Sequence, residues 1–390
     1  MLLNDDIADQ QRISKEIESF GKAGQKVILI QVPPMGRIGT NASGAEKTIH
    51  LSLTTRPLPK NLFFWGLKWA EMVLRMCWIG IKQKPDVVHA VNLITLFPAY
   101  LVACTLRIPF VYDSQEIESG VMSKARRPEW FWLWMEKSLA GKAAIVVVTD
   151  EFRFDITRKI LNLDRAKMFT LMSLPKISSL TITERKLRVE CKAKDKKLAV
   201  YFGVGIPGRH LEDIISAFAL LPMEYVFAFV GYIEASYKYS LEKIAEKLGL
   251  MQRLIFLPPV RWHELPDYIS SADCSFALYQ KNSINNLYCS PSKLFDALIA
   301  GLPVIGTDNP LIKKTLSNIK AGLCIESVTA QSIAAAIKNV TSLYSHEDRE
   351  RIAKDAKEIY TWESQESGFL EFYIETINVF NLETQKPGKI

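Results

Sequence analysis

The feature that most constrains this chain is a repeated alternation of short apolar runs with longer amphipathic segments. The alternation occurs in the amino-terminal half and begins again near residue 198. Strands separated by helices are typical of right-handed βαβ units, whose strands form a parallel sheet. We therefore expect an α/β fold, with strands at 26–32, 48–53, 86–91, 108–113, 143–149, 198–202, 225–230, 254–257, 274–278 and 303–306.

A polar segment, residues 178–197, divides this alternation into two halves. It is rich in Ser, Lys, Arg and Glu and holds little to bury, which is typical of an interdomain linker. A chain of 390 residues is also long for one hydrophobic core. We therefore expect a domain 1–177, a linker 178–197 and a second domain 198–360. A cleft between the carboxyl ends of two such sheets is where a ligand would bind.

Composition excludes several other classes. The six cysteines (77, 104, 191, 274, 289 and 324) have no metal-ligand spacing, so we expect no metal site, no disulfide framework and a reducing cytoplasm. The amino terminus lacks the pattern of a signal peptide, and no uncharged apolar run reaches membrane-spanning length. The net charge of +7 is compatible with anionic substrates, an anionic membrane or nucleic acid, and does not choose among them.

The chain opens unusually for an α/β domain. Residues 5–24 have the pattern of a capped amphipathic helix that ends at Gly24, with Ile13, Ile17 and Phe20 on one face. This helix precedes the first complete strand. Either Leu2-Leu3 is a short strand, or the natural start lies further upstream.

Residues 289–310 carry the clearest candidate for a binding site. A small polar and proline-containing start, Ser290-Pro291-Ser292, leads into a helix that Gly301 ends. A buried strand follows. A helix start with free backbone N–H groups beside Lys293 is suited to phosphate, and Asp296 lies one turn on, where it could accept from a sugar hydroxyl. An ordinary αβ unit would have the same pattern.

Several segments together resemble one family. The turn and helix at 201–218, the run PheLeuProProVal to AlaAsp at 256–273, and the stretch 289–310 occur in the order that GT-B glycosyltransferases of the retaining group 1, or family 4 (GT4), class have in their donor domain. ThrTrpGluSerGlnGlu resembles the start of that family's last helix, which crosses back to the first domain and would here span 361–390. Looser similarities lie in the first half, at 9–17, 85–96 and 111–117.

The resemblance implies a GT-B fold of two Rossmann-like domains and transfer of a sugar from a nucleotide-diphosphate sugar, with retention and without a metal or other cofactor. Arg209 would stabilise the leaving diphosphate, since a guanidinium fork suits phosphate oxygens. Asp113 and Glu116 would face the cleft as further catalytic candidates. The donor would contact Gly203, Arg209, Val260, Ser290, Ser292, Lys293, Leu294 and Asp296.

On the acceptor side the resemblance implies Asp9, Arg12, His89 and Gln115. This half also departs from the family pattern. Val91 and Asn92 stand where the family has His and Asp, and Gln115 replaces another His. In the donor half, Tyr288 stands where many members have a carboxylate, Asp296 replaces Glu, and Val204 replaces a basic residue. A His within a buried strand is more often a core residue than a catalytic one.

Two aromatic segments raise the question of a partner. Residues 61–82 and 126–134 combine Trp and Phe with Lys and Arg, as interfacial membrane-binding stretches do. A buried core helix would have the same composition. Peripheral contact with the inner face of the cell membrane would suit a lipid-linked acceptor. No nucleic-acid-binding module is recognisable, so we expect no nucleic-acid partner.

The sequence thus predicts a cytoplasmic glycosyltransferase that uses a nucleotide sugar and a glycan or lipid-linked acceptor in polysaccharide or glycolipid synthesis. Two alternatives remain. One is a catalytically degenerate GT-B protein that acts as a binding or partner subunit, which the replaced residues of the first half favour. The other is a sugar-nucleotide epimerase, which would need its own acid and base carboxylates.

Overall fold

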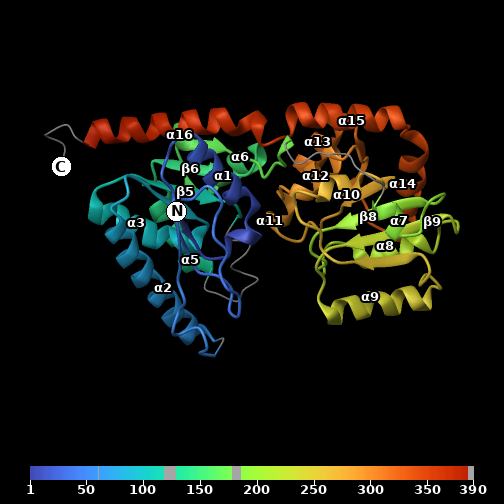
Figure 1. Cartoon of the computed structure of the whole chain (residues 1–390), viewed down its shortest axis with the longest axis horizontal. Helices are drawn as coiled ribbons and strands as arrows, with labels where there is room; N and C mark the ends of the chain where they lie inside the picture. Colours follow the sequence, from blue (N-terminus) through green and yellow to red (C-terminus); the bar gives the residue numbers. More distant parts are fainter. Residues whose placement is uncertain (60, 118–128, 178–185, 385–390) are drawn as a thin grey trace. The chain divides into compact units, whose positions relative to one another are not determined.

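The computed structural model describes residues 1–59, 61–117, 129–177 and 186–384 of the chain. These form two compact units. The first contains Met1–Ser173 together with the segment from Gln365 onward, and the second contains Leu174–Ser364. Each unit is built on its own parallel sheet (Figure 1).

The first unit has a seven-stranded parallel sheet in the order β3-β2-β1-β4-β5-β6-β7. Its strands are β1 Leu2–Leu3, β2 Ile28–Gln31, β3 Lys47–His50, β4 Val88–Val91, β5 Phe110–Ser114, β6 Ile145–Val148 and β7 Met168–Thr170. Its helices are α1 Gln11–Lys22, α2 Leu62–Gln83, α3 Leu93–Leu106, α5 Glu129–Ala140, α6 Glu151–Leu161 and α16 Glu363–Thr384, with short 3-10 turns at Ile7–Asp9 and Arg165–Lys167. Leu2-Leu3 is therefore a strand in the interior of the sheet, and β3 is at an edge.

The main core of this unit lies between the sheet and helices α2, α3 and α5. Met76, Leu96 and Trp132 contribute to it from the helices, and Ala90 and Tyr112 from the strands. Their side chains are fully buried, because α2 and α3 are apolar over most of their surface and the buried strands are nearly continuous in apolar residues.

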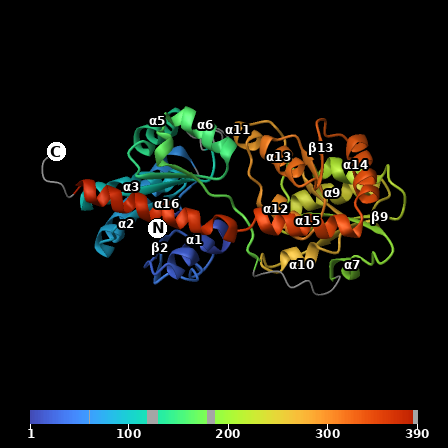
Figure 2. The ribbon, with the colours of Figure 1, turned by 90° about the horizontal axis from the view of Figure 1, so that it is seen from above.

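The last helix, α16, packs on the first unit although it is the most distant segment in sequence. Its Phe369 and Tyr373 contact Phe20 of α1, with ring centroids 5.7 and 4.7 Å apart. Phe169 of β7 contacts Phe369 at 5.6 Å. Figures 1 and 2 show α16 lying along this unit, as the resemblance of 361–366 to the start of the family's last helix implies.

The second unit has a six-stranded parallel sheet in the order β10-β9-β8-β11-β12-β13. Its strands are β8 Lys197–Phe202, β9 Tyr225–Val230, β10 Leu254–Leu257, β11 Cys274–Ala277, β12 Val304–Thr307 and β13 Gly322–Ile325. Its helices are α7 Lys186–Glu190, α8 Leu211–Phe218, α9 Ala235–Lys247, α10 Leu265–Ile269, α11 Ile284–Leu287, α12 Ser292–Ile299, α13 Pro310–Asn318, α14 Ala330–Leu343 and α15 His346–Ile359. Helices α8, α9 and α14 share one core with the strands, and α12 packs with α15 (Figure 1).

The structure draws the boundary between the units differently from the sequence. Part of the expected linker, residues 186–197, belongs to the second unit, where Leu187 is fully buried. Arg188 fixes this segment to the domain, since its guanidinium donates to the Ser271 carbonyl at 3.0 Å and pairs with Asp273 at 3.0 Å. The polar composition of the segment gave no sign that Leu187 and Arg188 fix it to the second unit. Residues 178–185 lie outside the described part of the chain.

Candidate functional site

The carboxyl edge of the second sheet has the geometry of a ligand site. The strand order reverses direction between β8 and β11, and such switch points are where ligands bind in open α/β sheets. The turn after β8 carries Gly203 and Arg209, the turn after β11 carries Tyr279, and Lys293 lies in the first turn of α12. The sequence-predicted donor residues Gly203, Arg209 and Lys293 therefore come together here.

Two glycines bring the turns after β8 and β9 into close contact. Gly231 has φ +149°, and a Cβ atom there would lie 2.0 Å from the Gly203 carbonyl oxygen. Gly203 has φ +106°, and a Cβ there would lie 3.7 Å from Lys293 Nζ. Both positions favour glycine for conformational reasons. The absent side chain at Gly203 leaves room beside the lysine amine.

The Lys293 amine is held in a fixed position over an aromatic ring. It donates a hydrogen bond of 2.6 Å to the Tyr201 hydroxyl and lies 3.9 Å from the centre of that ring. The Tyr201 hydroxyl in turn donates to the Val204 carbonyl at 3.2 Å. Burial, and then the charge of Arg209, lower the pKa of Lys293 to about 7. A nearby anion would favour the charged form.

Arg209 provides a second cation beside Lys293. Its guanidinium carbon lies 4.1 Å from the centre of the Tyr279 ring, and Lys293 Nζ lies 5.9 Å from the same centre. Within the described part of the chain, no hydrogen bond or ion pair engages the Arg209 guanidinium. Two cations arranged over tyrosine faces, one of them without an anionic partner, form a site suited to a diphosphate.

The start of α12 agrees only in part with the expected phosphate cradle. Leu294 is fully buried and its amide donates to the Pro291 carbonyl at 3.1 Å, so that N–H is already engaged. Ser292 begins the helix and is half-buried. The Ser290 hydroxyl is buried, and no described group forms a hydrogen bond with it. Buried hydroxyls without a hydrogen-bond partner are uncommon in folded proteins.

The other predicted donor-side residues lie on several segments of the second unit. Asp296 is half-buried one turn into α12, and its charge acts to raise the pKa of Lys293. Val260 is half-buried in the loop after β10, the edge strand, two strands away from β8. Tyr288 follows the last residue of α11. It occupies the position at which the resemblance implies a carboxylate in many family members.

Arg12 and His89, two of the residues predicted on the acceptor side, belong to a buried ionic cluster of the first unit. Arg12 of α1 pairs with Asp113 of β5 and donates to the Leu171 carbonyl at 3.0 Å. Asp113 is 0% exposed. Burial alone would raise its pKa, but the positive charge of Arg12 holds the pKa of Asp113 below its ordinary value. In this structure Asp113 is a buried ionic partner of Arg12, and its catalytic role stays a prediction.

Glu16 and His89 complete this cluster. His89 Nε2 lies 3.8 Å from a carboxylate oxygen of Glu16 and 3.8 Å from Asp113, and Arg12 Nε lies 3.6 Å from Glu16. Burial raises the pKa of Glu16 to about 8, although Arg12 acts in the opposite direction, and burial lowers the pKa of His89. The Glu16, His89 and Asp113 ligand atoms lie within 4.8 Å of one another, but the Arg12 guanidinium already supplies the positive charge that a metal would bring.

The remaining predicted residues of the first unit lie at its surface. Glu116 is 46% exposed and 3.4 Å from Arg153, which also donates to the Gln115 carbonyl. The Gln115 side chain donates from Nε2 to Asp113 at 3.2 Å, and the Gln115 backbone N–H donates to Asn92 Oδ1 at 3.2 Å. Asn92 and Gln115, which depart from the family pattern, thus form local structural bonds with each other.

Sequence reasoning missed three residues of these sites, Tyr201, Tyr279 and Glu16. The predicted residue Asp9 lies apart from the other residues predicted on the acceptor side. Asp9 pairs with Arg37 at 2.6 Å at the exposed surface and not with the buried cluster. Tyr201 and Tyr279 support the two cations, and Glu16 belongs to the buried cluster. The tyrosines could have been found from their place at the carboxyl ends of strands. Glu16 lies one helical turn after Arg12, which is the only sequence signal for it.

Comparison with known families assigns both halves of the chain. Residues 183–359 match the family described as glycosyl transferases group 1. Residues 23–171 match the family described as glycosyl transferase 4-like domain. The two matches together cover most of both units. No curated protein sequence matches the chain significantly.

Solved structures share the fold across nearly the whole chain. Sucrose-phosphate synthase from Thermosynechococcus elongatus aligns with a TM-score of 0.79 at 15% identity, covering 97% of this chain and 99% of that one. HepE from Anabaena, in complex with UDP-glucose, aligns with 0.72 at 15% identity, covering 96% and 99%. WaaG, a glycosyltransferase involved in lipopolysaccharide biosynthesis, aligns with 0.65 at 14% identity, covering 99% and 100%. Together with the family matches, these place the chain among the group 1 (GT4) glycosyltransferases, enzymes of the GT-B fold that transfer a sugar from a nucleotide sugar.

Proposed function

We propose that this protein transfers a sugar, with retention and without a metal, from a nucleotide-diphosphate sugar to a hydroxyl of a lipid-linked glycan or polysaccharide precursor. The observation that carries the proposal is the pair of cations, Lys293 and Arg209, held over Tyr201 and Tyr279 at the carboxyl edge of the second sheet. A solved relative in complex with UDP-glucose supports a nucleotide-sugar donor.

The pair of cations accounts for the difficult part of such a transfer. As the bond between sugar and phosphate breaks, the diphosphate gains negative charge, and positive groups that are already in place stabilise it. Arg209 would donate hydrogen bonds to two phosphate oxygens with its planar fork, and Lys293 would donate to a third. The leaving phosphate can then take the proton of the acceptor hydroxyl. Asp113, which is buried and paired with Arg12, is not needed as a base.

A thermal-shift panel with UDP, GDP, ADP and their sugars tests this proposal. We expect one nucleotide series to raise the melting temperature, and Arg209→Ala and Lys293→Met to remove most of that shift. Lys247→Met is the matched control, because Lys247 is an exposed lysine at the end of α9 in the same unit. If Lys293→Met and Lys247→Met bind the nucleotide equally well, the assigned donor site is wrong.

The substituted residues of the first unit favour a second candidate, a partner subunit without turnover. Asn92 and Gln115 occupy positions where the family has acidic or imidazole groups, and they hydrogen-bond to each other. Complementation of a strain that lacks the protein separates the candidates. Loss of biological activity in Arg209→Ala, with the fold intact, supports the enzyme. Full activity of that variant supports the partner subunit.

A membrane-surface site for the reaction is supported by an exposed apolar stripe on α2. Phe63, Leu67, Leu74 and Trp78 are 77%, 45%, 71% and 61% exposed and recur at helical spacing. Lys82 lies 3.7 Å from the Trp78 ring centre, at the end of the stripe. Apolar and aromatic residues that end in a cation are typical of helices that bind an anionic interface.

Three charged residues of α2 bind the chain's own loop or each other, whereas the sequence suggested that the charges of this segment contact a membrane. Glu71 accepts from the amides and hydroxyls of Thr54 and Thr55, and Lys68 donates to the Leu58 carbonyl. Arg75 pairs with Glu71 at 2.8 Å. The charged stripe of the helix therefore holds the loop that precedes it, and the exposed apolar stripe runs beside it. Residues 126–128 of the second aromatic segment lie outside the described part of the chain.

Helix α5 contributes a second pair of exposed aromatic residues. Trp130 and Trp134, one turn apart, are 74% and 62% exposed. Their neighbour Trp132 is fully buried and contacts Trp65 and Trp69 of α2, with ring centroids 5.2 and 5.5 Å apart. The exposed apolar residues of α2 and α5 are thus carried by helices that pack together. Among the described helices, none combines the length and hydropathy needed to span a membrane.

Sedimentation with vesicles tests the membrane-surface part of the proposal. We expect binding to anionic vesicles that falls at least about tenfold in Leu74→Ser combined with Trp78→Ser. Tyr239→Ser is the control, since Tyr239 is 61% exposed on α9 of the second unit. Equal sedimentation of wild type with vesicles and in buffer would refute membrane contact and leave the donor site unaffected. Bound protein is expected at the inner face of the cell membrane.

A further inference from the structure

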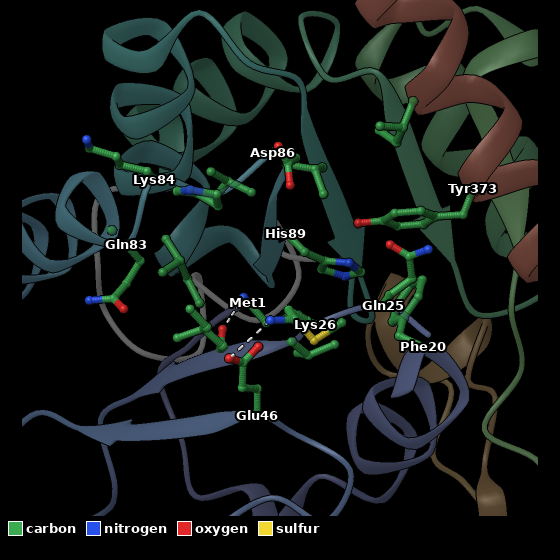
Figure 3. A pocket seen from close by; sticks show the side chains of 18 of the residues that line it. Met1, Phe20, Gln25, Lys26, Glu46, Gln83, Lys84, Asp86, His89 and Tyr373 are labelled. Atoms are coloured by element: carbon green, nitrogen blue, oxygen red, sulfur yellow. Dashed lines mark hydrogen bonds and ion pairs between the residues drawn. The ribbon is translucent and has the colours of Figure 1, made fainter. Parts of the chain in front are cut away.

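Buried polar side chains with incomplete hydrogen bonding occur in both units. In the first unit, the ring nitrogens of His89 have no hydrogen-bond partner among the described residues. Figure 3 shows His89 beside Tyr373 in the wall of a cavity of about 770 Å³. In the second unit, the Ser290 hydroxyl and the Asn309 side-chain oxygen lack a partner among the same residues. Ser290 is a predicted donor contact, and the side chain of Asn309 is bonded to the segment that precedes it.

The Asn309 side chain does not cap its own helix. Asn309 stands at the amino end of α13, where an asparagine side chain usually accepts from backbone N–H groups of the helix. Among the described residues, it makes no such bond. Its Nδ2 instead donates to the carbonyls of Asn286 and Leu287, at 2.8 and 3.1 Å. Because Asn309 is 0% exposed, these bonds are shielded from solvent, and the side chain holds the carboxyl end of α11.

The two residues before it in the chain bind the same loop. Thr307 ends β12, and its hydroxyl oxygen accepts from the Tyr279 backbone N–H at 3.1 Å. Asp308 forms an ion pair with Lys281. Three consecutive residues therefore hold segment 279–287 at both of its ends.

The start of this segment supports Arg209. The guanidinium carbon of Arg209 lies 4.1 Å from the centre of the Tyr279 ring. The Gln280 backbone N–H donates to the Gly208 carbonyl at 3.3 Å, and Gly208 directly precedes Arg209. The segment is thus tied to the turn that carries the first of the two cations.

The end of the segment leads to the second cation, Lys293. The Cys289 backbone N–H donates to the Asn286 carbonyl at 3.3 Å, and this carbonyl is one of the two that Asn309 binds. Ser290 follows Cys289, and Lys293 lies in the first turn of α12. Because so few residues separate Asn286 from Ser290, a displaced α11 would displace the Ser290 hydroxyl and the start of α12 as well.

From these contacts we propose that Asn309 is a positioning residue of the donor site. Its amide does not touch the nucleotide sugar. It fixes the end of α11, and through it the Ser290 hydroxyl and the turn of α12 that carries Lys293. Groups that are already in place bind a ligand more tightly than groups that must first be ordered, so the Asn309 amide lowers the Kd for the nucleotide sugar. This inference rests on the proposed function of that site.

A thiol on the same segment reports on its position. Cys289 is 7% exposed, and Cys274 of β11 is fully buried in the same unit. Asn309→Leu removes the amide and keeps a branched side chain of similar shape. Asn318→Leu is the matched control, since the Asn318 amide donates to the Tyr360 hydroxyl at 3.2 Å from the other end of α13. Mass spectrometry follows alkylation of each cysteine by iodoacetamide, and isothermal titration gives the Kd for the nucleotide sugar.

Asn309→Leu is expected to raise this Kd at least about tenfold. It should also speed alkylation of Cys289 at least about tenfold while Cys274 reacts at the wild-type rate, because only the segment opens. Asn318→Leu should leave the Kd and both alkylation rates unchanged. In the wild type, saturating nucleotide sugar should slow the alkylation of Cys289 more than that of Cys274.

Wild-type affinity in Asn309→Leu would overturn the proposal. So would an equal acceleration at Cys289 and Cys274, because that result indicates loosening of the whole unit. Absence of protection of Cys289 in the wild type would overturn it without any variant. If the wild type binds no nucleotide sugar, the proposed function and this inference fail together, whereas unchanged affinity in Asn309→Leu removes only this inference.

Discussion

The pKa of Lys293 allows a quantitative prediction about donor binding. Burial and the neighbouring Arg209 lower this pKa to about 7, so the protonated fraction falls from about nine-tenths at pH 6 to about one-tenth at pH 8. If only the protonated lysine binds the diphosphate well, the apparent Kd is the intrinsic Kd divided by that fraction. The apparent Kd should therefore rise about tenfold between pH 6 and pH 8.

Isothermal titration with the nucleotide sugar identified by the thermal-shift panel measures this change. A nucleotide sugar is used because its diphosphate carries no terminal phosphate group that titrates in this range. Lys293→Arg is the control, since arginine stays charged at both pH values. We expect its Kd to change less than twofold, whatever its absolute affinity. An equal pH dependence in wild type and Lys293→Arg would refute the assignment of Lys293 as the titrating phosphate ligand.

Three further predictions concern stability and the turns. Arg12→Met should destabilise the first unit by about 3–5 kcal/mol in urea, because it leaves buried carboxylates without their partner, whereas Arg37→Met, at an exposed pair, should cost at most about 1 kcal/mol. In the wild type the free energy of unfolding should fall as pH rises from about 4.5 to about 8, because the raised pKa of Glu16 means that the folded state holds its proton more tightly than the unfolded state. Glu16→Gln should make this fall smaller, and an unchanged pH profile would contradict the reasoning. Gly231→Ala should disturb the turn beside Gly203 and weaken nucleotide binding at least tenfold, and Gly249→Ala, with nothing within 4 Å of its Cβ, should leave binding unchanged.

The strands could be predicted from sequence because their apolar runs record burial directly. Every expected strand is present, with its ends shifted by at most three residues, and β7 and β13 are additional. β13, Gly322–Ile325, was missed because it is only partly buried and starts at a glycine with φ +137°. Boundaries between units were less accessible, since a single side chain such as Arg188 can fix a polar segment to a domain.

The site could be predicted less completely than the fold. Arg209, Lys293 and Gly203 were identified because backbone turns and cations have local sequence signals, and the structure brings them together. The tyrosines that hold the cations come from separate strands, and only the order of the sheet brings them close. Burial of Asp113 depends on α1 covering β5, a contact between residues far apart in sequence.

The position of α16 has a consequence for how the polypeptide is made. A ribosome releases the seven strands of the first sheet long before it releases Phe369 and Tyr373, which cover Phe20 and His89. The amino-terminal half therefore emerges with an uncovered face and must wait for the complete second unit to be synthesised. A premature stop ahead of Gln365 would leave the second unit whole and the first unit unfinished. Truncating mutations near the 3′ end of the gene would thus destabilise the amino-terminal half of the protein.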